Sequence, residues 1–210
     1  MAGRLRFNCA LAAEPKTGMS NDYLSDVTIL IVDDQEFILN LVREMLRVLG
    51  AETILEAKDG TEAWEVLQRN PVDLMLVDWY MKPTDGVTLV KRIRNDKKSP
   101  NPYLPIIMMS GYSECLRIIK ARDSGINEFV VKPLSAKALF GRIVNVIEHP
   151  RQFVRTENFF GPDRRRKNQE VEDDRRGKGA KEMKAAQSPH KEMSQSEVDA
   201  FLNPDSVPAD

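Results

Sequence analysis

Short apolar runs alternate with stretches of helical periodicity through the middle of the chain. The apolar or β-rich runs lie at residues 28–32, 52–57, 74–77, 106–109 and 128–131. After each run, apolar side chains recur at intervals of three and four residues, the spacing of one face of an α-helix. These helical stretches are 38–49, 61–69, 87–93, 114–124 and 135–148. The pattern therefore predicts five strands, each followed by a helix.

Successive strand–helix units are typical of an α/β fold with a parallel sheet covered by helices on both faces. The run Leu74 to Val77 is continuously apolar, as expected for a strand buried on both faces. Because crossovers between parallel strands are right-handed, few strand orders are possible. We predict a flavodoxin-like (βα)5 doubly wound sheet over residues 27–149.

Polar side chains follow four of the five predicted strands. Asp33 and Asp34 follow the first strand, Asp78 the third, Ser110 the fourth and Lys132 the fifth. Any one of them alone is an ordinary turn residue. Carboxyl ends of parallel strands meet at one edge, with neighbouring strands about 5 Å apart, so we expect these side chains to converge.

The converging groups predict a particular chemistry. Crowded carboxylates repel one another unless a cation is present, and Mg²⁺ accepts both carboxylate and phosphate oxygens. Lys132 would offset the negative charge of a phosphoryl group on Asp78, and Ser110 would donate a hydrogen bond to it. The sequence therefore predicts a magnesium-assisted phosphoryl site.

The composition of the chain limits its possible partners and its cellular compartment. The formal net charge is -1, which gives no reason to expect nucleic acid or a membrane surface as a partner. No apolar run is long enough to cross a bilayer. Cys9 and Cys115 form neither a disulfide framework nor a metal-site spacing. We expect a reduced, cytosolic protein.

These motifs resemble the receiver domain of two-component response regulators over Val27 to Glu148. The segments that carry the resemblance are Val32-Asp33-Asp34, Asp78, Asp85-Gly86, Ser110-Gly111, Phe129 and Val131-Lys132-Pro133. The resemblance implies an acidic pair that binds Mg²⁺, phosphoryl transfer from a histidine kinase to Asp78, and a cis Lys132-Pro133 bond. It also implies that Ser110 and Phe129 form the switch that responds to phosphorylation.

The loop after Asp78 departs from the family pattern. It reads Trp79 to Gly86, with its proline one place later than usual, and Tyr80 stands where the family's backbone carbonyl binds Mg²⁺. Tyr80 and Tyr112 are expected to flank the phosphoryl group and to exclude the attacking water. The alternative is that both rings only pack on the surface.

The two ends of the chain have a different composition. We predict a disordered extension over residues 1–26, with Met19 as an alternative start, and a flexible charged linker over residues 150–193. Phe159-Phe160 is a candidate for folding back onto the receiver. The cluster Arg164 to Lys167 is interpreted as part of a solvated linker rather than a nucleic-acid contact.

Residues 194–204 predict a short amphipathic helix. Ser194 and Glu197 have capping-box spacing, and Val198, Phe201 and Leu202 fall on one helical face. Such a short helix is marginal alone, so we expect it to dock in a groove. The peptide is similar to the segment by which the flagellar motor switch protein binds a chemotaxis receiver. The alternative is a frayed end with no partner.

The combined prediction is a receiver phosphorylated on Asp78 by a histidine kinase with Mg²⁺. Its output would be protein binding, linked to chemotaxis, with a motor protein or another receiver as a partner of residues 194–204. It would be no enzyme beyond self-catalysed phosphoryl transfer and autodephosphorylation. An aspartyl-phosphate phosphatase is disfavoured because Tyr80 replaces the second Asp of such enzymes. A phosphorylation-independent scaffold is disfavoured because every acidic residue and the lysine are present.

Overall fold

The central element is a parallel sheet, seen in a computed structural model that describes residues 23–157, 159–163 and 192–202. Its strands are β1 (Thr28–Val32), β2 (Thr53–Ala57), β3 (Leu74–Asp78), β4 (Ile106–Ser110) and β5 (Glu128–Val131). They are ordered β2-β1-β3-β4-β5, and every neighbouring pair is parallel. This is the predicted flavodoxin-like order.

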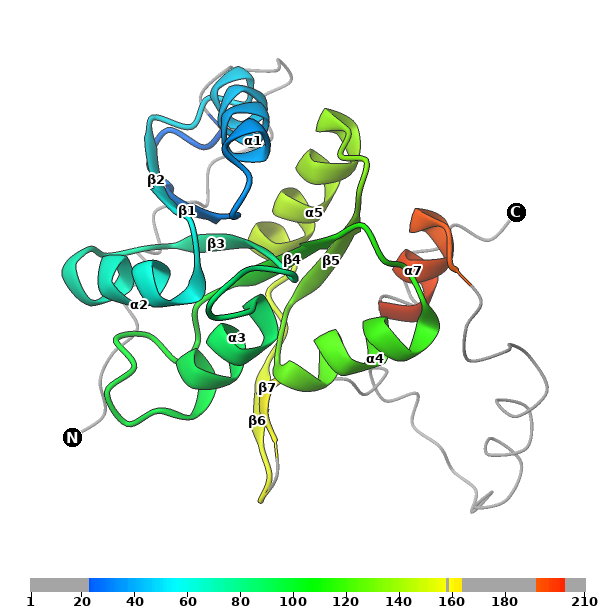
Figure 1. The fold of residues 1–210 in the computed structure, drawn as a ribbon. Helices are drawn as coiled ribbons and strands as arrows, with labels where there is room; N and C mark the ends of the chain where they lie inside the picture. The colour runs from blue at the N-terminus through cyan, green and yellow to red at the C-terminus, as the bar shows by residue number, and fades with distance from the viewer. Residues whose placement is uncertain (1–22, 158, 164–191, 203–210) are drawn as a thin grey trace.

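Five helices cover the sheet in two layers (Figure 1). They are α1 (Glu36–Val48), α2 (Gly60–Arg69), α3 (Gly86–Asn95), α4 (Cys115–Ser124) and α5 (Ala136–Glu148). Helices α1 and α5 pack on one face, and α2, α3 and α4 pack on the other. Helices therefore cover both faces of the parallel sheet, and the prediction of a doubly wound sheet is confirmed.

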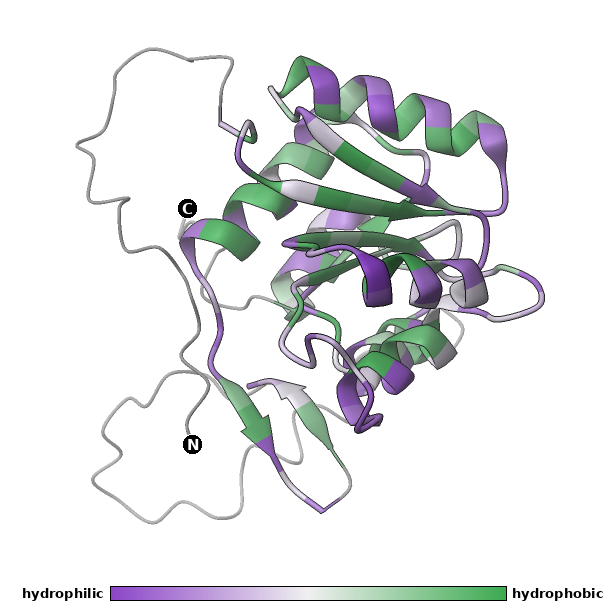
Figure 2. Cartoon of the chain, turned by 90° about the vertical axis from the view of Figure 1, so that its left-hand side faces the viewer, coloured by the Kyte–Doolittle hydropathy of each residue, from purple (hydrophilic) through white to green (hydrophobic). Residues whose placement is uncertain are grey.

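The strands at the centre of the sheet are apolar except for a polar residue at one end, whereas the helices carry alternating apolar and polar stripes (Figure 2). Successive side chains of β3 enter opposite cores: Leu74 and Leu76 face α1 and α5, while Met75 and Val77 face the other helices. Because both faces are covered, no polar alternation marks these strands. The continuous apolar run in the sequence has this cause.

The turn after the β3 loop depends on a glycine. A Cβ on Gly86 would lie 2.2 Å from the backbone oxygen of Asp78, closer than any side chain tolerates. The Gly86 N–H donates to the Trp79 carbonyl at 3.0 Å, and Asp85 caps α3 by accepting from Thr88 N at 2.7 Å. The predicted Asp85-Gly86 turn thus closes the loop against the end of β3.

The predicted N-terminal extension, residues 1–26, ends four residues too late. Leu24 is buried, and the Tyr23 hydroxyl donates to Glu148 Oε1 at 3.0 Å while its ring meets the edge of Phe140. Residues 23–26 therefore belong to the folded unit, because they anchor on α5. Residues 1–22 lie outside the described part of the chain.

The predicted linker contains a folded hairpin, which corrects that prediction over residues 153–163. Strands β6 (Phe153–Arg155) and β7 (Phe160–Pro162) pair antiparallel. Phe153 and Phe160 each lie 5.2 Å, centroid to centroid, from the ring of Tyr103 in the loop before β4. Phe160 thus folds back onto the receiver, because Phe153 and Phe160 both pack on Tyr103, which is far from them in sequence. Residues 164–191 are outside the description.

The last described element is α7 (Gln195–Leu202), which lies beside β5 between α4 and α5 (Figure 1). The predicted capping box is present: Ser194 N donates to Glu197 Oε2 at 2.7 Å, and Glu197 N donates to Ser194 Oγ at 3.3 Å. Of the predicted residues 194–204, the side chain of Phe201 and residues 203–204 are not described.

In the described residues, no helix has the length and apolarity needed to cross a membrane.

Candidate functional site

The register of the sheet brings the predicted strand-end residues to one edge. Asp78 pairs with Met109, so Ser110 lies one position further along β4, opposite Val131 of β5. The Lys132 N–H then donates to the Ser110 carbonyl at 2.8 Å. The order of strands in the sheet, rather than their order in sequence, makes these residues neighbours.

Lys132 is the centre of the site. Its Nζ lies 2.8 Å from Asp33 Oδ2 and 2.6 Å from Asp78 Oδ1. Both carboxylates are buried, with 0% of Asp33 and 4% of Asp78 exposed. The second oxygen of each accepts a backbone N–H: Asp33 Oδ1 from Gln35 at 2.9 Å, and Asp78 Oδ2 from Tyr80 at 2.7 Å. The Lys132–Pro133 bond is cis, as the resemblance implied.

Burial controls the electrostatics of this triad. Desolvation raises the pKa of the Asp78 carboxyl above its ordinary value, although the hydrogen bond and charge of Lys132 pull it back down. Burial also lowers the pKa of the Lys132 ammonium, but its hydrogen bonds to Asp33 and Asp78 outweigh this and leave that pKa raised. Asp78 is therefore held in a place that its charge disfavours, as expected of a functional group.

The raised pKa of Asp78 predicts that Asp78→Asn is more stable than the parent protein at neutral pH. A folded-state pKa above the unfolded one means that the native state binds the proton more tightly, so stability falls as pH rises between the two values. The Asn variant lacks this cost. Urea unfolding of both proteins at neutral pH and at about pH 4, near the ordinary pKa of Asp, checks the sign. The advantage should shrink at the lower pH, and an Asn variant less stable at neutral pH would contradict it.

Asp34, the third predicted carboxylate, is exposed, whereas Asp33 and Asp78 are buried. Within the residues that the structure describes, no three His, Cys, Asp or Glu side chains form a cluster that could hold a metal ion. Instead, the Lys132 ammonium lies between Asp33 and Asp78. The donor chemistry nevertheless suits Mg²⁺, because carboxylate oxygens from two strand ends and a neighbouring exposed Asp are hard ligands.

Ser110 and Phe129, the predicted switch pair, are both buried. The Ser110 Oγ accepts from Tyr112 N at 3.1 Å, at the start of the loop after β4. Phe129 lies in the core shared by α2, α3 and α4. The structure thus places the pair on adjacent strands, with Ser110 at the edge that carries Asp78.

Two tyrosine rings and an arginine form a cluster on the loops that follow Asp78 and Ser110. Tyr80 and Tyr112 are about half exposed, and their ring centroids are 5.2 Å apart. Arg117 of α4 lies over the Tyr112 ring, with its Cζ 4.4 Å from the centroid, and donates a hydrogen bond to the Tyr80 hydroxyl. The rings were singled out in the sequence, but Arg117 was not, because nothing local marks a helical arginine as a partner of the two loops.

Comparison with known proteins identifies the class. Residues 29–144 match the family model of the response regulator receiver domain. The chain is 33% identical over 120 residues to a chemotaxis protein CheY homolog of Campylobacter jejuni, covering 57% of this chain and 91% of that protein. It is 34% identical to chemotaxis protein CheY of Pseudomonas aeruginosa, with 57% and 95% covered. The chain belongs to the response regulator receiver domain family, and its receiver is CheY-like.

Solved structures agree with this assignment. A putative response regulator from Chloroflexus aurantiacus superposes with a TM-score of 0.54 at 28% identity, covering 59% of this chain and 98% of that one. A CheX–CheY–BeF3–Mg²⁺ complex from Borrelia burgdorferi gives a TM-score of 0.53 at 26% identity, with 58% and 89% covered. Receiver domains are signalling proteins rather than classical enzymes, so the geometry above belongs to a signalling protein.

Proposed function

We propose that this receiver is phosphorylated on Asp78 by a histidine kinase, with Mg²⁺ bound, and signals through protein binding. One observation carries the proposal: Asp78 is a buried carboxylate at a strand end, 2.6 Å from the Nζ of Lys132 and close to Asp33. A nucleophilic oxygen beside a fixed cation is the arrangement that phosphoryl transfer needs, because most of its catalysis is positioning and charge stabilisation.

The reaction is a transfer between two nucleophiles. An oxygen of Asp78 attacks the phosphorus of a phosphohistidine, the new O–P bond forms as the P–N bond breaks, and the electron pair of that bond stays on the imidazole nitrogen. The product is an acyl phosphate on Asp78. The Lys132 ammonium would stabilise the added negative charge, and the Ser110 hydroxyl, whose oxygen accepts from Tyr112 N, would donate its hydrogen to a phosphoryl oxygen.

Mg²⁺ would be held by Asp33, Asp34, Asp78 and the backbone carbonyl of Tyr80. When bound, it supplies positive charge that shields the phosphoryl oxygens from the carboxylates. Asp33 and Asp78 are already turned toward one cation, the Lys132 ammonium. Asp34 follows Asp33 directly and is exposed, so it is the third carboxylate proposed for the oxygen donor set.

The test of this function uses the full chain, Mg²⁺ and a small phosphodonor such as acetyl phosphate. Intact-mass measurement should show the addition of one phosphoryl group, and a chelator should suppress it. A second arm with a phosphorylated histidine kinase should give the same product. Absence of uptake with every donor, or uptake unaffected by removing Mg²⁺, would overturn the proposal.

The output is proposed to be protein binding in chemotaxis. The relatives reported above are named chemotaxis proteins, and the Borrelia burgdorferi relative was solved in complex with CheX. We infer that the functional receiver spans residues 27–149, which includes the family match at 29–144. The phosphatase alternative remains disfavoured, because the position two residues after Asp78 holds the half-exposed ring of Tyr80.

Shielding by the two tyrosines predicts a slow loss of the phosphoryl group. If Tyr80 and Tyr112 limit the approach of water, changing both to Ser should speed hydrolysis by roughly tenfold, equivalent to about 1.4 kcal/mol of barrier. The decay of purified phosphoprotein, followed by intact mass, measures this. Tyr103→Ser, a half-exposed tyrosine on the hairpin side, is the control. A double variant that decays no faster than the parent would refute the shielding.

A further inference from the structure

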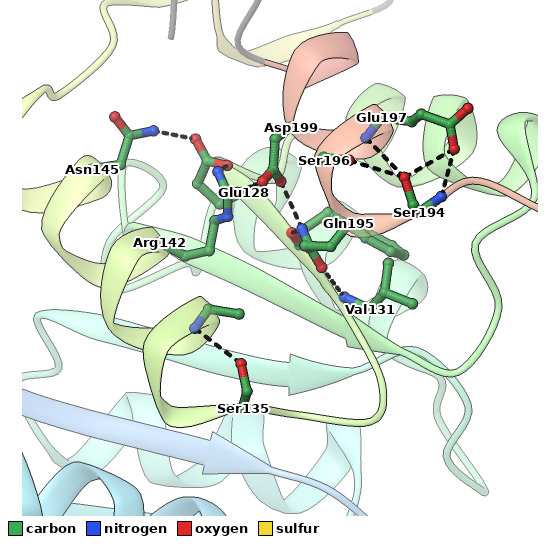
Figure 3. Close-up of polar contacts among 12 residues, drawn as sticks. Glu128, Val131, Ser135, Arg142, Asn145, Ser194, Gln195, Ser196, Glu197 and Asp199 are labelled. Atoms are coloured by element: carbon green, nitrogen blue, oxygen red, sulfur yellow. Dashed lines mark hydrogen bonds and ion pairs between the residues drawn. The ribbon is translucent and has the colours of Figure 1, made fainter. Parts of the chain in front are cut away.

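The free edge of the sheet at β5 is covered by a side chain from α7. Because β5 is the last strand of the sheet, its outer N–H and C=O groups have no neighbouring strand. The Gln195 carboxamide takes that place (Figure 3): its Oε1 accepts from Val131 N at 2.6 Å, and its Nε2 donates to the Phe129 carbonyl at 3.1 Å. One amide side chain thus acts as a strand's peptide group would.

The residues just before α7 form a second backbone attachment. Met193 N donates to the Ser113 carbonyl at 2.9 Å, and Glu192 forms an antiparallel bridge with Glu114. Ser113 lies in the loop that follows Ser110, between β4 and α4. The loop after β4 and the edge of strand β5 are therefore held by the same short segment.

Apolar anchors fill the space between these attachments. Val198 is 0% exposed and Leu202 is 6% exposed, and Met193 is also buried. They belong to the same core cluster as Phe129 and Ile118. A helix as short as α7 is marginal in water, so this burial is its main source of stability.

Ion pairs and hydrogen bonds fix the orientation of α7 (Figure 3). Arg142 of α5 pairs with Asp199 of α7 and lies 3.5 Å from the buried Glu128 of β5. Arg151 Nη2 donates to the Leu202 carbonyl at 2.7 Å, at the helix end. Both arginines also pair with Glu128 of β5, so each cation joins that strand to an acceptor on α7.

Both attachments lead directly to the phosphorylation site. Val131, held by Gln195, precedes Lys132, whose ammonium contacts Asp78. Ser113, held by Met193, is in the loop that begins at Ser110. A phosphoryl group on Asp78 would need Lys132 and Ser110 fixed around it, and the docked segment bonds the backbone of Val131, next to Lys132, and of Ser113, three residues after Ser110.

We propose that residues 192–202 are a built-in ligand of the surface formed by α4, β5 and α5, whose docking and the phosphorylation of Asp78 strengthen each other. The phosphorylation half rests on the function proposed above, whereas the docking half stands on the contacts alone. Each event orders backbone that the other requires, so the second costs less entropy than the first. By linkage, each raises the affinity for the other by the same factor.

The proposal also gives this surface a selectivity. Because residues 192–202 belong to the same chain as the surface, their binding is intramolecular, and an external helix must compete with a high effective concentration of them. A partner of the same surface would be an amphipathic helix with an acidic residue opposite Arg142. Its binding to this chain would require displacement of α7.

The docking test measures hydrogen exchange at single amides in the full chain. In the parent protein the Val131 N–H is bonded to Gln195, so Gln195→Ala should speed its exchange by about tenfold, the scale of one hydrogen bond. The Asn127 N–H, bonded to Ile106 O inside the sheet, is the internal reference and should not change. Glu192→Ala, which removes an exposed side chain and leaves the backbone bridge, is the matched control.

Val198→Asp is the second, stronger variant, because it places a charge at the most buried anchor. Its fold is checked by circular dichroism before exchange is read. Exchange at Val131 that is equal in parent, Gln195→Ala and Val198→Asp would overturn the docking. Protection that falls on dilution of the parent would also overturn it, because the occupant would then be a second copy.

Competition is tested with a free peptide of residues 192–204. It should bind full-length Val198→Asp. Its affinity for the parent should be lower by at least about tenfold, since the parent's own segment competes at high effective concentration. Equal binding to both proteins would contradict occupancy in cis.

The coupling is tested with beryllium fluoride and Mg²⁺ as a phosphoryl mimic. The mimic should slow exchange at Val131 further in the parent, and Val198→Asp should bind the mimic more weakly than the parent does. If the mimic binds but leaves Val131 unchanged, or speeds its exchange, the coupling is wrong while the proposed function survives. If the mimic does not bind the parent, the proposed function fails and the docking result stands by itself.

Discussion

Changing Asp78 to Asn is expected to reduce phosphoryl uptake to background. The amide is almost the same size as the carboxylate but has no anionic oxygen to attack phosphorus, and Lys132 retains Asp33 as its partner at 2.8 Å. The fold should therefore persist while the chemistry is lost. Intact mass after incubation with Mg²⁺ and acetyl phosphate measures the effect.

The matched control for this variant is Asp73→Asn, near the other end of the same strand. Asp73 is exposed and accepts from Thr28 N at 2.9 Å, just before the start of β3, whereas Asp78 is at the other end of that strand. It should be phosphorylated as fully as the parent. Uptake by Asp78→Asn at the parent's level would remove Asp78 from its proposed role.

Changing Arg94 to Met is expected to lower the free energy of unfolding by at least about 3 kcal/mol, since each buried acceptor left without its donor costs about 1–3 kcal/mol. Arg94 is 1% exposed. Its guanidinium donates to the carbonyls of Gly125 and Pro102 at 2.9 and 2.8 Å, and to Asn127 Oδ1 at 3.3 Å. Burial lowers its pKa to about 9, which still leaves it charged at neutral pH.

The loss should extend to the hairpin of β6 and β7. The Arg94 guanidinium lies 5.0 Å from the centroid of Phe153, and a Cβ on Gly125, which Arg94 holds, would meet the Phe160 carbonyl at 2.9 Å. Urea unfolding gives the stability, and proteolysis near residue 158 reports the hairpin. Arg69→Met, which removes an exposed pair with Glu65, should change stability by less than about 1 kcal/mol. Equal effects of the two variants would contradict the buried role of Arg94.

The sheet and the edge of the site could be predicted because their signals are local. An apolar run such as Leu74 to Val77 marks a buried strand, and a carboxylate at its end is placed by the fold itself. What the pattern could not predict was which carboxylates share Lys132. Asp33 is buried and contacts Lys132, whereas Asp34 is exposed, and two adjacent aspartates in a sequence carry no sign of which one is buried.

Contacts between segments far apart in sequence could be predicted only where the spacing of apolar residues indicated a buried helical face. The face with Val198 and Leu202 could be read from helical periodicity, and both side chains are buried. The role of Gln195 could not be read, because an amide in a short helix has no signature of pairing with a strand edge. The hairpin was missed for a similar reason: Phe153 and Phe160 gain their partner, Tyr103, only in three dimensions.

The measurement that most directly tests phosphorylation at this site is chemical localisation of the acyl phosphate. Borohydride reduces an aspartyl phosphate to homoserine, so the phosphorylated full chain is reduced, digested and sequenced by mass spectrometry. Homoserine should be found at position 78 alone, and only after incubation with phosphodonor and Mg²⁺. Homoserine at another aspartate, or phosphate retained on a residue other than Asp78, would contradict the assignment of Asp78 as the phosphoryl acceptor.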